Sequence, residues 1–130
     1  MRGIEFYRDS EGYIEFRSEP RLKCFGMWLT DDIHGVHYTC LDLLADLEDV
    51  AAGRKESESW EGNAWAAEIT AEGVHLQNLW RDALKAHYPL PEARKIVQQY
   101  WRLLAEDPAR DRAIAEWEAD NERPHPYPGL

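Results

Sequence analysis

Apolar and polar residues alternate in two short segments near the N-terminus and in two more near the middle of the chain. Residues 4–8 and 13–17 alternate on either side of a polar turn that contains glycine, and residues 64–70 and 74–80 do the same around a second such turn. A period of two is typical of half-buried strands, and glycine favours a tight connection between them. The sequence therefore predicts two β-hairpins.

The segment between the hairpins contains one further predicted strand. Residues 22–29 are mostly apolar, which is typical of a strand buried on both faces, and Gly26 would allow a bulge or a close backbone approach there. Residues 54–59 are polar throughout, and we expect them to form a loop.

Apolar residues recur every three or four positions in three other segments. The first spans about residues 38–52, the second opens at Pro91 and runs to about Asp107, and the third, which is more polar, starts at Pro108. This spacing predicts amphipathic helices, and proline is tolerated in a first helical turn. The order of strands, helix, strands and helices predicts an α+β fold: an antiparallel sheet built from two hairpins plus a further strand, with the helices packed on one face.

The chain length of 130 residues is typical of one domain. We expect this domain to span residues 1–121, and residues 122–130 to form an extended or disordered tail because prolines recur in it. No apolar run has the length of a membrane helix and the N-terminus has no signal-peptide pattern, so we expect a cytoplasmic protein that does not enter a membrane. In that compartment Cys24 and Cys40 should be reduced.

Acidic residues outnumber basic ones by ten, with 25 Asp and Glu against 15 Lys and Arg. Such a chain repels phosphate backbones, which argues against a nucleic-acid ligand. The excess is local, because residues 31–61 contain nine acidic and only two basic residues. Carboxylates steer a basic partner and aromatic rings anchor it, so this segment predicts binding to a basic protein. The predicted contact residues are Asp31, Asp32, Asp42, Asp46, Asp49, Trp60 and Glu61.

Two other interpretations of these residues remain open. The acidic segment is also typical of a solvated face that serves only solubility. Trp28 and Trp65, which lie in or beside the segment, are expected to pack in the core and not at an interface.

Three residues have a spacing that could serve metal chemistry. His34, His37 and Cys40 recur at every third position, so one helical turn could direct them at a zinc ion. No CxxC or HExxH motif accompanies them, no serine lies in a GxSxG motif, and no phosphate-binding glycine loop is present. We therefore expect no catalytic residues, no metal and no other cofactor. The alternative is a small metal-dependent hydrolase that uses these three residues.

Several motifs resemble those of immunity proteins from contact-dependent growth inhibition systems. These motifs are Trp60-Glu61-Gly62-Asn63-Ala64, Glu72-Gly73-Val74, Asn78-Leu79-Trp80, Met27-Trp28-Leu29-Thr30-Asp31-Asp32-Ile33, Ile4-Glu5-Phe6-Tyr7-Arg8-Asp9 and Gly12-Tyr13-Ile14-Glu15. The resemblance covers about residues 1–105. It implies a cytoplasmic, cofactor-free protein that binds and neutralises the C-terminal domain of a cognate antibacterial toxin, which the charge argument predicts to be a basic nuclease. The remaining alternative is a cytoplasmic adaptor unrelated to toxins.

Overall fold

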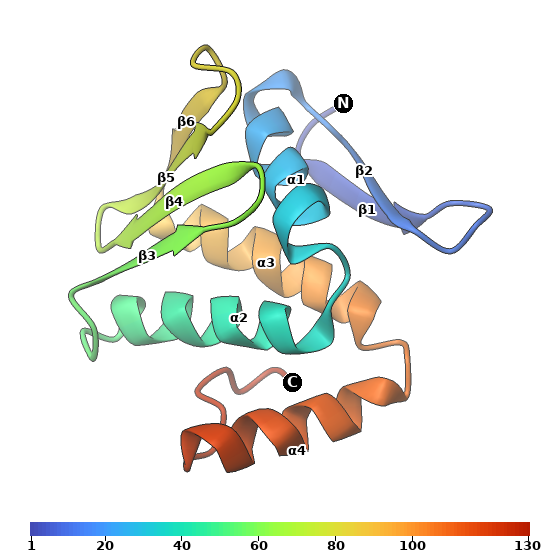
Figure 1. The fold of residues 1–130 in the computed structure, drawn as a ribbon, viewed down its shortest axis with the longest axis vertical. Coiled ribbons are helices and arrows are strands. Elements are labelled where there is room, and N and C mark those ends of the chain that lie inside the picture. The colour runs from blue at the N-terminus through green and yellow to red at the C-terminus, as the bar shows by residue number, and fades with distance from the viewer.

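The computed structural model describes all 130 residues, and it shows an α+β fold (Figure 1). It contains two antiparallel sheets and four α-helices; α1, α2 and α3 contact strands, and α4 packs against α2. None of these helices has the length and apolar character required to cross a bilayer. The elements in chain order are β1 (Ile4–Arg8), β2 (Ile14–Ser18), α1 (Lys23–Trp28), α2 (His37–Ala51), β3 (Ser57–Glu61), β4 (Trp65–Thr70), β5 (Gly73–Asn78), β6 (Lys85–Tyr88), α3 (Leu90–Leu104) and α4 (Ala109–Asn121).

Both predicted hairpins are present, but they belong to different sheets. Strands β1 and β2 form a two-stranded sheet of their own, in which Phe6 lies opposite Phe16. Strands β4 and β5 are the central pair of a four-stranded sheet with the order β3-β4-β5-β6. Its edge strands were not predicted: β3 begins inside the polar segment 54–59, and β6 is only four residues long.

The prediction of a strand over residues 22–29 is wrong. A short 3-10 turn leads into α1, and a single π-helical turn, Leu29–Ile33, follows it. Phe25, Trp28 and Leu29 are fully or almost fully buried on one face of this helical segment, because their spacing of three and four fits a helix as well as a buried strand. Gly26 does provide a close approach, since a Cβ atom at this position would overlap the ring of Phe16.

The hydrophobic core lies between the larger sheet and the helices. Helix α2 packs against α3, β3 and β4 on one side and against α4 on the other, so it is the central layer of the molecule (Figure 1). Leu41, Leu44 and Leu47 on α2 are all buried, as the helical spacing predicts. Cys40 is also buried there, and both cysteines are free. The opposite face of the larger sheet carries no helix.

Residues 122–130 contain no helix or strand, but they pack against the domain. The segment turns back between α4 and α2 (Figure 1). His125 is only 8% exposed, and its Nε2 lies 2.8 Å from the carbonyl oxygen of Leu41. Arg123 forms an ion pair with Asp49 at 2.8 Å. The segment expected to be an extended or disordered tail thus covers part of α2.

Candidate functional site

The seven predicted contact residues lie in three different places. Asp42 and Asp46 of α2 and Trp60 and Glu61 of β3 line one hollow of about 420 Å³ between α2, β3 and α4. Asp31 and Asp32 lie beside the β3–β4 turn, where they accept hydrogen bonds from it. Asp49 lies near the C-terminal end of α2. We call the first place the acidic hollow, because Asp42, Asp46, Glu58 and Glu61 line it together with only two cations, Lys55 and Arg123.

Two of the four carboxylates in the acidic hollow accept hydrogen bonds from indole groups. Asp42 and Asp46 are four residues apart and therefore share one face of α2. Oδ1 of Asp42 accepts the Nε1–H of Trp117 at 2.8 Å, and Oδ2 of Asp46 accepts the Nε1–H of Trp60 at 2.8 Å. Nζ of Lys55 donates to Oδ1 of Asp46 at 2.8 Å. These tryptophans therefore serve the fold as well as any interface.

The acidic hollow has more negative than positive charge within it. Burial raises the pKa of Asp42 and the neighbouring Asp46 carboxylate raises it further, although the hydrogen bond from Trp117 acts in the opposite direction. Lys55 is already shared between Asp46 and Glu58, to which Nζ donates at 2.9 Å. The other cation, Arg123, is paired with Asp49. A further positive charge entering the hollow would therefore be stabilised by Asp42.

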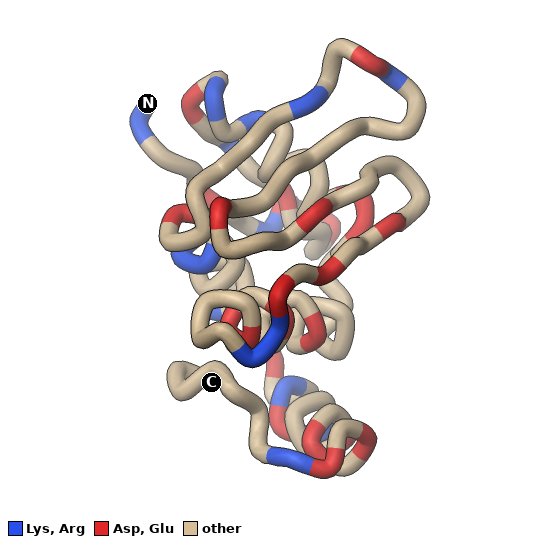
Figure 2. The backbone as a smooth tube through the Cα atoms, turned by 90° about the vertical axis from the view of Figure 1, so that its left-hand side faces the viewer, with Lys and Arg blue, Asp and Glu red and all other residues tan.

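Acidic residues also predominate outside the hollow on the same side of the molecule. Figure 2 views this side and shows Asp and Glu positions recurring along the strands of the larger sheet and along α4, with fewer Lys and Arg positions among them. Glu68, which does not line the hollow, is exposed on β4. A basic partner that approaches this side would meet a negative field before contact.

Asp31 and Asp32 hold the β3–β4 turn. The two carboxylate oxygens of Asp32 accept the backbone N–H groups of Ala64 and Trp65, both at 3.0 Å, and burial raises its pKa despite these bonds. Oδ2 of Asp31 accepts the indole N–H of Trp65 at 3.0 Å. A Cβ atom on Gly62 would overlap the Asp32 carboxylate, so a larger residue at this position would displace that carboxylate from the turn. Both aspartates thus have structural partners.

Asp49 is the most deeply buried of the seven residues, with 2% of its surface exposed. Burial alone would raise its pKa, but hydrogen bonds and charge from Arg123 and Arg54 outweigh burial and lower the pKa. Nε of Arg54 and Nη2 of Arg123 each lie 2.8 Å from an Asp49 oxygen. Because it is enclosed and paired with two guanidinium groups, Asp49 does not present a carboxylate to a partner.

The three residues of the metal alternative do not converge. His34 is exposed and adopts a left-handed conformation with φ of 52°, and its Nδ1 lies 3.2 Å from the Thr30 carbonyl oxygen. Nε2 of His37 lies 2.8 Å from the carbonyl oxygen of Leu104, while Cys40 is fully buried. No group of three or more His, Cys, Asp or Glu side chains is arranged to hold a metal ion. The hydrolase alternative therefore has no geometric support.

Comparison with known protein families, curated proteins and solved structures finds no match.

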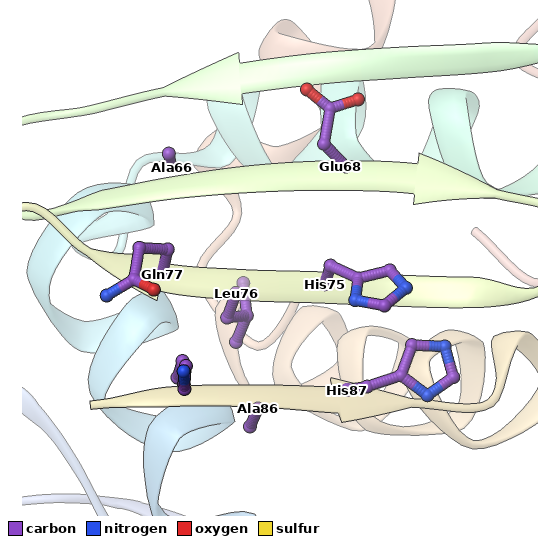
Figure 3. A pocket seen from close by; sticks show the side chains of 8 residues that line it. Ala66, Glu68, His75, Leu76, Gln77, Ala86 and His87 are labelled. Atoms are coloured by element: carbon purple, nitrogen blue, oxygen red, sulfur yellow. The ribbon is translucent and has the colours of Figure 1, made fainter. Parts of the chain in front are cut away.

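A second hollow, of about 450 Å³, lies on the open face of the larger sheet (Figure 3). His75 and His87 face each other across β5 and β6 with their ring centroids 4.2 Å apart. Glu68 lies opposite His75 on β4, but it accepts a hydrogen bond from Ser59 at 2.5 Å. This hollow is open to solvent, and the Glu68 carboxylate points away from the imidazole pair (Figure 3).

The most exposed aromatic residue was not among the predicted contact residues. Trp80, just beyond the end of β5, has 79% of its surface exposed, and Leu79 beside it has 41% exposed. The available signal was the pair of apolar residues that continues past Asn78 into a polar turn. The sequence predicts that this pair ends the strand of residues 74–80, and a strand position does not distinguish a buried ring from an exposed one.

Proposed function

We propose that this protein is an immunity protein that binds a basic antibacterial toxin domain one-to-one and thereby neutralises it in the cytoplasm. The observation that carries the proposal is the uncompensated charge of the acidic hollow. Asp42 is partly buried with a raised pKa, and the nearby Lys55 is already bonded to Asp46 and Glu58. The resemblance to immunity proteins of contact-dependent growth inhibition systems supplies the class of partner.

The mechanism of neutralisation follows from complementary charge. A nuclease needs lysine and arginine side chains in its cleft to bind phosphates. An arginine or lysine from that cleft would pair with Asp42 in the hollow, while Glu58 and Glu61 at its rim would steer the approach. The same side chains would then be unable to bind the nucleic-acid substrate. Truncation of one partner in such a buried pair costs about 2–5 kcal/mol, whereas a rim charge mainly changes the association rate.

A variant that tests the role of charge in binding must keep the hydrogen bonds that the two indole groups donate to α2. Reversing the charge at Asp42 and Asp46 would remove the acceptors of Trp117 and Trp60. A loss of affinity could then result from a loss of stability and not from the change in charge. Asp42→Asn keeps an acceptor oxygen for Trp117 and removes the charge, and Glu61→Gln removes a rim charge.

The matched control changes net charge by the same amount elsewhere. Glu11→Gln with Glu15→Gln alters two exposed carboxylates of the β1–β2 hairpin, outside the acidic hollow. Affinity for a catalytically inactive form of the cognate toxin domain would be measured by calorimetry at low and moderate salt. The Asp42→Asn/Glu61→Gln variant should bind at least about tenfold more weakly at low salt, and the control by less than about threefold.

Two results would contradict different parts of the proposal. If the wild-type protein neither co-purifies with the toxin domain nor protects cells that express it, the immunity function is wrong. If it does both, but the two double variants bind equally well at low salt, the acidic hollow is not the contact surface.

A further inference from the structure

Trp80 is the most exposed large apolar side chain of the molecule. It lies at the tip formed by the β3–β4 and β5–β6 turns, and Leu79 extends the apolar surface there. Tryptophan is enriched among the residues that dominate binding energy at protein interfaces, because a large ring removes much surface from water when it enters a pocket. Exposure alone does not define a binding site, so the hydrogen bonds that hold the ring are also needed as evidence.

The Trp80 ring is fixed before any partner arrives. Its Nε1–H donates to the carbonyl oxygen of Asn63 at 3.0 Å, across from the neighbouring turn. Oδ1 of Asn78 accepts the backbone N–H groups of Trp80 and Arg81, both at 2.9 Å, and the N–H of Leu79 donates to the Ala64 carbonyl oxygen at 2.8 Å. A side chain that is already ordered loses little conformational entropy on binding.

The β3–β4 turn that bonds the Trp80 ring is itself held by Asp32. Asp32 binds the N–H groups of Ala64 and Trp65 and so fixes the conformation of residues 62–64, where Asn63 presents its carbonyl oxygen to Trp80. One carboxylate and a set of partly buried backbone bonds thus position the exposed indole. The arrangement does not bury Trp80, so its indole faces solvent while its Nε1–H stays bonded to Asn63.

Charge near the tip indicates the chemistry of the partner. Glu61, the last residue of β3, precedes Asn63 by two residues and also lines the acidic hollow, so this carboxylate lies between the hollow and the turn that bonds Trp80. Asp31 is a further exposed carboxylate bonded to this turn through Trp65. The adjacent Arg81 and Asp82 balance each other. The surroundings of Trp80 therefore favour a basic surface.

We propose that Trp80 is the hydrophobic anchor of the interface and enters an apolar pocket, rimmed by lysine or arginine, on the basic toxin domain. This inference rests on the proposed function. Trp60, which the sequence predicted as the anchor, is partly buried and its indole N–H is bonded to Asp46. A cationic rim would also gain from contact with the exposed indole face.

The test compares Trp80→Ala with Tyr13→Ala against the same inactive toxin domain. Tyr13, on the turn of the separate β1–β2 hairpin, is also a mostly exposed aromatic residue, with 59% of its surface exposed. Trp80→Ala should weaken binding by about 30-fold or more, the usual threshold for a dominant interface residue, and Tyr13→Ala by less than about threefold. Because the lost contact is apolar, the ratio of wild-type to Trp80→Ala affinity should stay nearly constant as salt is raised, unlike the ratio for Asp42→Asn/Glu61→Gln. Melting temperatures of both alanine variants should remain close to that of the wild type, since both side chains are exposed.

The outcomes separate this inference from the proposed function. Tight wild-type binding with equal affinities for Trp80→Ala and Tyr13→Ala would overturn the anchor assignment and leave the immunity function standing. Failure of the wild-type protein to bind the toxin domain would overturn both. Light scattering gives a third result: a wild-type dimer that Trp80→Ala converts to a monomer would assign the ring to a second copy of this chain and overturn the inference.

Discussion

Substitution of Asp32 should destabilise the protein more than any other change of one surface-accessible carboxylate to an amide. Asp32→Asn keeps one acceptor oxygen but turns an NH₂ group toward the second of the two N–H groups that the carboxylate now binds, those of Ala64 and Trp65. A hydrogen bond to a charged group contributes about 1.5–3 kcal/mol, and an N–H left without a partner costs a further ~1–3 kcal/mol where it is shielded from water. Burial raises the pKa of Asp32, which means that burying its charge costs free energy. The neutral amide does not carry this cost, so the substitution regains part of the lost stability. We expect a net loss of about 2–3 kcal/mol in the free energy of unfolding.

Asp31→Asn is the matched control, because it removes the same charge one residue earlier. Its amide oxygen can still accept the indole N–H of Trp65, so the loss should stay below about 1 kcal/mol. Urea unfolding followed by tryptophan fluorescence measures both values, and hydrogen exchange of the Ala64 and Trp65 amides shows whether the turn has opened. Equal stabilities for the two variants, with unchanged protection of both amides, would refute the role assigned to Asp32.

Two further predictions concern the C-terminal segment and the α1–β2 contact. Burial lowers the pKa of His125, whose surroundings also include Arg123 and Glu118. As the pH falls, the unfolded chain therefore takes up a proton at this histidine before the folded chain does. The free energy of unfolding should thus decrease as the pH drops below about 6.5. His125→Gln keeps a donor for the Leu41 carbonyl oxygen, so its free energy of unfolding should differ less between pH 7 and pH 5.5 than that of the wild type; identical pH dependence in urea titrations would contradict this. Gly26→Ala should lower stability by about 1–2 kcal/mol, because overlap with Phe16 exceeds the gain in helix propensity. The same change in a Phe16→Leu background should cost clearly less, and an equal cost there would show that the ring is not the obstacle.

Local periodicity was sufficient to predict most elements of this fold. Residues 4–8 and 64–70 alternate, and the helical spacing of Leu41, Leu44 and Leu47 recurs in α2, because a strand or helix that buries one face must repeat its apolar residues at its own period. It failed at residues 22–29, where a short apolar run fits both periods. It also missed β3 and β6, which are short edge strands stabilised by pairing with a neighbour and not by their own composition.

The sequence by itself determined the α+β class, the acidic excess of residues 31–61 and four of the residues that line the acidic hollow. Only the tertiary structure decided which hydrogen-bond partner each aspartate of that segment has. Asp42 receives its hydrogen bond from Trp117, 75 positions away, and Asp32 binds N–H groups more than thirty positions away. The sequence does not distinguish a carboxylate without a partner from one that accepts an indole bond. The difference depends on which distant segment the fold brings next to that carboxylate. The exposure of Trp80 depends on tertiary packing for the same reason.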